Sequence, residues 1–228
     1  MPNSDSINNA LSYLEALRNA NTTLSYKEIC KFSDEQKSEY NTLLDNFIDL
    51  NGSSDVGNPS LNSDKGKSLE RLATFLIEKS GGIFEVEANI KTTTNEIDQI
   101  IRVNQTGRIL IGNNLLDKRL QRFVSECKNY KKAVDVTFVG KLCSLLITNG
   151  VKIGIMFSYY GISGHNWNYG SGLVRKFYLS KENEDDRSCI IDFNIEDFEK
   201  IRDGSNLLEF IESKILGLQF DTDYSRFL

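Results

Sequence analysis

Two carboxylates and one lysine lie in two short stretches whose alternating pattern is typical of β-strands. Asp98 lies in EIDQI, and Glu126 and Lys128 lie in SECKN. Residues two apart in a strand share a face, so Glu126 points with Lys128 while Cys127 points the other way. Because an ionised carboxylate among apolar neighbours needs a cation, Asp98 and Glu126 could hold a divalent metal, with Lys128 neutralising a phosphate. A sheet face exposed to solvent would show the same alternation, so spacing alone leaves both readings open.

The composition excludes several other kinds of catalytic or metal site. His165 is the only histidine among 228 residues, which excludes a metal site built from several histidines. It lies in a glycine-rich loop at residues 161–172, whose Trp167 and Tyr169 could stack on a substrate base or simply belong to a surface loop. Four cysteines lie far apart without a CxxC motif and are expected to be reduced and buried: Cys30, Cys127, Cys143 and Cys189.

Charge is unevenly distributed along the chain. The net charge of −5 argues against a protein that coats nucleic acid through bulk attraction. Residues 63–180, however, hold 17 basic against 10 acidic side chains, between flanks that are acidic. Within that centre, residues 117–132 contain six basic and two acidic side chains, enough for several phosphate contacts. A solvated helix or strand face would look similar.

Hydrophobic periodicity predicts an α/β protein. The spacing of apolar residues predicts helices over residues 7–17 and 34–48, and residues 51–64, rich in Gly, Asn, Ser and Asp, are expected to be a linker. The order of elements after the linker is helix, three strands, helix and strand, over residues 65–80, 83–90, 96–103, 122–128, 134–149 and 151–158. A short helix, a strand and two helices follow at residues 173–179, 189–193, 195–202 and 207–216.

These elements predict two parts of the chain. Residues 1–62 form a helical N-terminal appendage, and residues 63–228 form the α/β domain, with its core at about residues 65–160. No apolar run approaches the ~18 residues that a membrane span needs, and the first twenty residues lack the features of a secretory signal. We therefore expect a cytoplasmic protein that does not enter the membrane.

The two stretches together resemble the signature of the PD-(D/E)XK nuclease superfamily. Asp98 matches the motif aspartate, and Glu126 and Lys128 match the (D/E)xK tripeptide with Cys127 in the middle. Glu70 is similar to a glutamate that the family often places on the helix before the first strand. The proline of the motif is absent. The resemblance implies a restriction-endonuclease-like αβββαβ core with a mixed central sheet.

The resemblance also implies an activity, namely Mg²⁺-dependent endonuclease cleavage of DNA, with Mn²⁺ as a substitute, in a bacterial restriction or phage-defence role. Asp98, Glu126 and the Cys127 carbonyl would bind the metal, Glu70 would hold a second metal or orient the first, and Lys128 would act electrostatically. Contacts to the DNA backbone are expected from four basic residues: Arg122, Lys131, Lys132 and Lys141.

The sequence leaves open which partners the protein has and whether it is an enzyme or a binding protein. Cleavage of both strands by one such site generally implies two copies, which is compatible with a homodimer, and the N-terminal helical region could bind a protein partner. The alternative to an enzyme is a catalytically idle member of the fold that binds nucleic acid or scaffolds a defence or repair complex. The presence of Glu70, Asp98, Glu126 and Lys128 together argues against it, because a binding module does not need the full set.

Overall fold

The structure, a computed structural model, describes most of the chain. The described ranges are residues 22–53, 60–91, 96–164, 169–183 and 186–228, with residues 12, 15, 16 and 19. Most of the helix expected at residues 7–17 and the loop residues His165 and Trp167 lie outside them.

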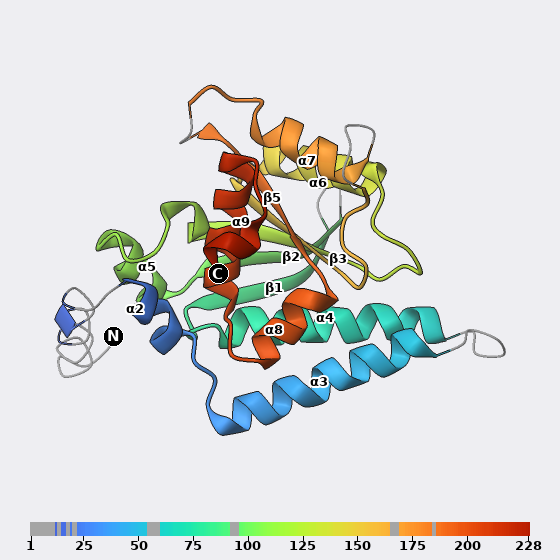
Figure 1. Ribbon diagram of the computed structural model, residues 1–228, viewed down its shortest axis with the longest axis horizontal. Coiled ribbons are helices and arrows are strands. Elements are labelled where there is room, and N and C mark those ends of the chain that lie inside the picture. The colour runs from blue at the N-terminus through green and yellow to red at the C-terminus, as the bar shows by residue number, and fades with distance from the viewer. Residues whose placement is uncertain are drawn as a thin grey trace.

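The centre of the fold is one open sheet of five strands in the order β1-β2-β3-β4-β5 (Figure 1). The first three strands are antiparallel neighbours, whereas β3, β4 and β5 run parallel. Their bounds are Phe84–Lys91, Glu96–Val103, Arg122–Lys128, Ile153–Ser158 and Cys189–Phe193. The predicted α/β class and mixed central sheet are therefore confirmed.

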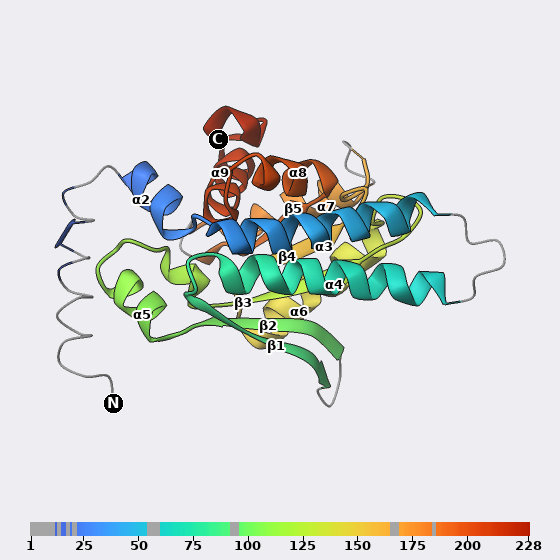
Figure 2. The same ribbon diagram turned by 90° about the horizontal axis from the view of Figure 1, so that it is seen from below.

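Helices cover both faces of the sheet (Figures 1 and 2). One buried cluster joins the sheet to α3, α4, α8 and α9, and a second joins its other face to α6 and α7. The helices on the first face are Asp34–Gly52, Leu61–Lys79, Ile195–Arg202 and Leu207–Phe220, and those on the second are Val136–Asn149 and Gly170–Tyr178. Helices α2 (Thr22–Ile29) and α5 (Gln105–Gly112) and the short 3₁₀ turns η1 (Lys118–Gln121) and η3 (Tyr224–Phe227) complete the described elements. None of the helices in the described ranges combines the length and apolar character that a membrane crossing needs.

Several details differ from the sequence prediction. Helix α2 was not predicted, and α3 continues to Gly52, into the expected linker. Helix α4 begins at Leu61, inside the expected linker, because Leu61 is buried and Ser60 Oγ donates to Asp64 Oδ2 at 3.0 Å. Helix α5 was not expected, since eight residues give little periodicity. Its start is fixed by Asn104, whose side chain accepts a hydrogen bond from the Gly107 amide.

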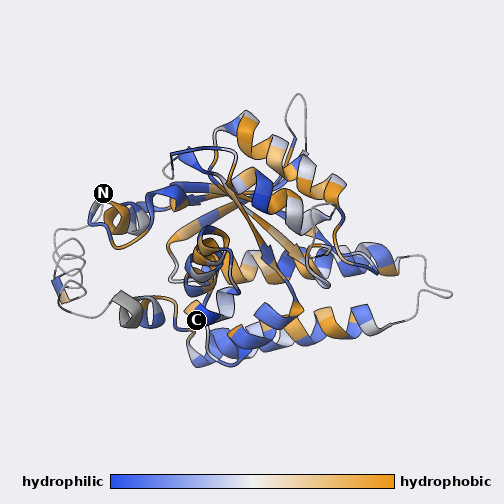
Figure 3. Cartoon of the chain, turned by 45° about the horizontal axis from the view of Figure 1, so that its top comes forward, coloured by the Kyte–Doolittle hydropathy of each residue, from blue (hydrophilic) through white to orange (hydrophobic). Residues whose placement is uncertain are grey.

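Helix α3 is amphipathic (Figure 3) and supplies part of the main core. Its Tyr40, Leu44 and Phe47 are fully buried, and the Tyr40 hydroxyl donates to the carbonyl of Phe198 on α8 at 2.8 Å. The helix therefore packs with the sheet domain. The division at residues 62–63 stays a prediction.

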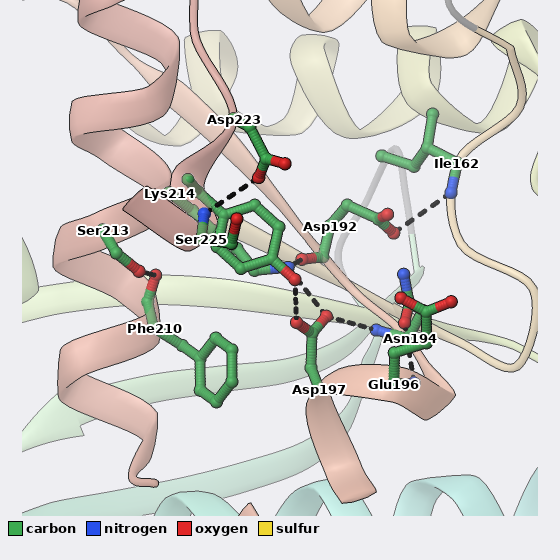
Figure 4. A network of polar contacts seen from close by, with 11 residues as sticks. Ile162, Asp192, Asn194, Glu196, Asp197, Phe210, Ser213, Lys214, Asp223 and Ser225 are labelled. Atoms are coloured by element: carbon green, nitrogen blue, oxygen red, sulfur yellow. Dashed lines mark hydrogen bonds and ion pairs between the residues drawn. The ribbon is translucent and has the colours of Figure 1, made fainter. Parts of the chain in front are cut away.

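A buried charged network holds the last helices against β5 (Figure 4). Lys214 on α9 donates to Asp197 Oδ2 at 2.7 Å and to the Asp192 carbonyl at 2.6 Å. Tyr224 donates to Asp197 Oδ1, and the Asp192 carboxylate accepts from the Ile162 amide. Burial raises the pKa of Asp192 to about 6, against the opposing charge of Lys214.

Replacing Phe47 with alanine tests whether α3 is part of the folding unit. Phe47→Ala opens a cavity in the shared core and is expected to lower the free energy of unfolding by about 3–5 kcal/mol in urea denaturation. Asn46→Ala, which changes an exposed neighbour on the same helix, is the control and should cost less than about 0.5 kcal/mol. Equal stability of the two variants would contradict the shared core.

Asp192→Asn tests the raised pKa of the partly buried Asp192 carboxyl. An acid whose pKa is raised on folding stabilises the fold below its ordinary pKa and loses that contribution as pH rises through its folded value. The wild type should therefore lose about 2–3 kcal/mol relative to the variant between pH 4 and pH 7. Chemical unfolding at a series of pH values measures the difference, with the exposed Asp203→Asn as control. A pH-independent difference would contradict the assignment.

Candidate active site

Asp98 lies where β2 and β3 separate. The pairing of these strands begins at Gln99 and Ser125, whereas β3 continues beside β4 as far as Lys128 and Ser158. The Asp98 carboxylate occupies the gap, and its Oδ2 accepts a hydrogen bond from the Cys127 amide at 2.9 Å. The side chain thus replaces a backbone partner that β2 no longer supplies.

Lys128 links the two predicted carboxylates. Its Nζ lies 2.7 Å from Glu126 Oε1 and 3.2 Å from Asp98 Oδ2, and it donates to the Cys127 carbonyl at 3.3 Å. Burial acts to lower the pKa of Lys128, but the charges and hydrogen bonds of Glu126 and Asp98 outweigh burial and raise it. The ammonium group is therefore charged at neutral pH.

Glu126 is almost completely buried, with a side-chain exposure of 2%. Its Oε1 also accepts a hydrogen bond from Lys141 Nζ of α6, at 3.4 Å. Its Oε2 has no hydrogen-bond partner among the described residues. A buried carboxylate oxygen without a partner is costly and calls for an explanation such as a water molecule or an ion. Two carboxylates and the Cys127 carbonyl are hard oxygen donors, which fit Mg²⁺ or Mn²⁺.

Among the residues that the structure describes, no three Asp, Glu, Cys or His side chains are placed to bind one metal ion together. The donors that the described residues bring together are thus Asp98, Glu126 and one backbone carbonyl.

Glu70 faces the site from α4. It shares with Asp98 a cleft of about 480 Å³ that is also lined by Thr74, Glu78 and Asn89. Burial raises the pKa of Glu70, the charge of Asp98 raises it further, and Lys128 opposes both. Glu70 is thus electrostatically coupled to the Asp98–Lys128 pair. A larger cavity, about 760 Å³ between α7, β5 and α9, is lined by none of the predicted site residues.

A series of side-chain hydrogen bonds beneath the site was not predicted from the sequence. Ser125 donates to Gln99 Oε1 at 2.5 Å, Gln99 Nε2 donates to Thr74 Oγ1 at 2.7 Å, and Thr74 donates to the Glu70 carbonyl. These hydrogen bonds connect α4 to both strands that supply the acidic residues. Their signal in the sequence is two polar residues, Gln99 and Ser125, at inward positions of otherwise apolar strands.

The predicted DNA contacts fall into two groups. Lys141 reaches the site through Glu126, and Lys131 and Lys132 lie exposed in the loop that follows β3. Arg122 begins β3, six residues before Lys128, which places the two about 20 Å apart along the strand. The structure therefore does not bring Arg122 to the site.

Comparison of the chain with protein-family models, curated proteins and solved structures finds no match. The resemblance to the PD-(D/E)XK superfamily accordingly stays a prediction.

Glu70→Gln tests the coupling between α4 and β2. Because the pKa of Glu70 is raised on folding, its ionisation costs stability, so the neutral variant should be more stable than the wild type at pH 7–8 and equal to it near pH 4. Solvent screening of this half-buried side chain limits the gain to less than about 1 kcal/mol. Thermal unfolding at both pH values measures it. In an Asp98→Asn background the gain should shrink, and a gain of the same size there would contradict the coupling.

Proposed function

We propose that this chain is a metal-dependent endonuclease of the PD-(D/E)XK type, with a restriction-endonuclease-like core, that hydrolyses phosphodiester bonds in DNA with Mg²⁺. The main support is one arrangement: Asp98 and Glu126 meet around the Lys128 ammonium, and a buried oxygen of Glu126 lacks a partner among the described residues. A sheet face that is merely solvated does not bury a carboxylate at 2% exposure.

Each residue of the site has its own role in the proposed reaction. Asp98, Glu126 and the Cys127 carbonyl would hold the ion, which when bound lowers the pKa of a water molecule and screens the phosphate. Lys128, whose raised pKa keeps it protonated, is unsuited to act as a general base and instead supplies fixed positive charge for the phosphate. Glu70, which lines the same cleft as Asp98, would hold a second ion or orient the first.

Two further features agree with a nucleic-acid substrate. Lys131 and Lys132 follow the site directly and lie exposed. The excess of basic residues between residues 63 and 180 makes this centre of the chain attractive to phosphates despite the net charge of −5. The restriction or phage-defence role rests on the resemblance alone.

Plasmid digestion tests the activity. With supercoiled plasmid, the wild type should cut only when Mg²⁺ is present, and Asp98→Asn should lower the rate at least about 100-fold. Asparagine keeps an acceptor for the Cys127 amide, so the fold should be retained. The matched control is Asp203→Asn, an exposed residue at the end of α8, which should cut as the wild type does.

A second measurement separates metal binding from cutting. Mg²⁺ should raise the melting temperature of the wild type and of Asp203→Asn but not of Asp98→Asn. Full activity of a purified Asp98→Asn variant would refute the mechanism. DNA binding by the wild type without any metal-dependent cutting would favour the idle binding protein.

A further inference from the structure

The loop at residues 129–133, which joins β3 to the segment before α6, is fixed at both ends. Asn129 Nδ2 donates to the Lys65 carbonyl of α4 at 2.9 Å. At the other end, the Val134 amide donates to the Gly161 carbonyl, and the Ser163 amide donates to the Val134 carbonyl, both at 2.8 Å. The short stretch between these anchors, Tyr-Lys-Lys-Ala, is therefore held in place beside the site.

Tyr130 presents an aromatic ring from this stretch. Its exposed fraction is 42%, although tyrosine can bury a large apolar area. The ring packs on Phe138 of α6 with centroids 5.1 Å apart and planes inclined by 34°. The Lys128 Nζ lies 6.0 Å from the centroid of that same Phe138 ring. The aromatic pair thus adjoins the site lysine.

The neighbours of Tyr130 point to the kind of ligand. Lys131 and Lys132 follow it in the chain and are exposed, so an aromatic face and two cationic side chains are presented together. Positive charge along a backbone path with an aromatic side chain for a base is how proteins bind single-stranded nucleic acids. Single exposed tyrosines are common on surfaces, but this one is two residues from Lys128, a Cα separation of at most ~7 Å.

We propose that Tyr130, supported by Phe138, is a stacking platform for an unpaired base beside the scissile phosphate, and that the preferred substrate is single-stranded DNA or a single-stranded stretch within duplex DNA. Bases inside an intact duplex have both faces stacked on their neighbours and cannot engage this ring. Lys131 and Lys132 contact the adjoining phosphates. This inference rests on the proposed nuclease function and specifies its substrate class.

The test compares the binding of two labelled probes, a fluorescein-labelled 20-mer of thymidines and a 20-base-pair duplex, by fluorescence anisotropy at one salt concentration. It is done without divalent cations and again with Ca²⁺. Tyr130→Ala and Tyr130→Leu should weaken binding to the single strand about 5-fold to 100-fold and change duplex binding less than about twofold. Tyr130→Phe keeps the ring and should bind as the wild type does. Phe220→Ala, which removes an exposed ring on α9, is the control.

The outcomes separate the inference from the proposed function. If the wild type cuts plasmid but Tyr130→Ala and Tyr130→Leu keep its affinity for the single strand, the platform is refuted and the nuclease stands. An equal loss for both probes refutes the single-strand preference. A wild type that neither binds a probe nor cuts plasmid refutes the nuclease and the platform together, whereas plasmid cutting without affinity for the single strand refutes the platform alone.

Discussion

The burial of the Glu126 carboxylate is the constraint on which the site depends. An ionised group removed from water costs several kcal/mol unless a partner of opposite charge and further hydrogen bonds compensate. Here Lys128 lies 2.7 Å from one oxygen, and Lys141 approaches the same oxygen from α6. The second oxygen is left without a partner among the described residues. The protein therefore retains a buried acceptor that hydrophobic packing would not need, and this acceptor supports the proposed metal ion.

The topology of the sheet explains why these groups meet. In an antiparallel pair, the start of one strand lies beside the end of the other. Asp98 is near the start of β2, and Glu126 and Lys128 are near the end of β3, so the pairing brings them to the same edge. The continued parallel pairing of β3 with β4 keeps Lys128 in place after β2 has turned away. The site thus lies at the junction of the antiparallel and parallel halves of the sheet.

The sequence predicted the elements well where periodicity was long or where glycine ended a helix. Gly150, in a left-handed conformation, ends α6 at the position expected from the pattern, and the strands agree within two residues. Short or polar segments were harder: α5 has only eight residues, and the first turn of α4 has the composition of a loop. Tertiary contacts, such as Lys141 on Glu126 or Tyr130 on Phe138, could not be read from spacing, because each joins residues whose elements must first be packed.

The protonation state of Lys128 could not be predicted from the sequence either, and it limits the chemistry that Lys128 can perform. A lysine that serves as a base must lose its proton near neutral pH, which requires burial without a counterion. Lys128 is partly buried, but it lies between two carboxylates, and their attraction raises its pKa instead. The same two carboxylates that make Lys128 a permanent cation also need neutralising charge themselves. In the proposed function, a bound Mg²⁺ would supply that charge and would screen the phosphate that the substrate brings.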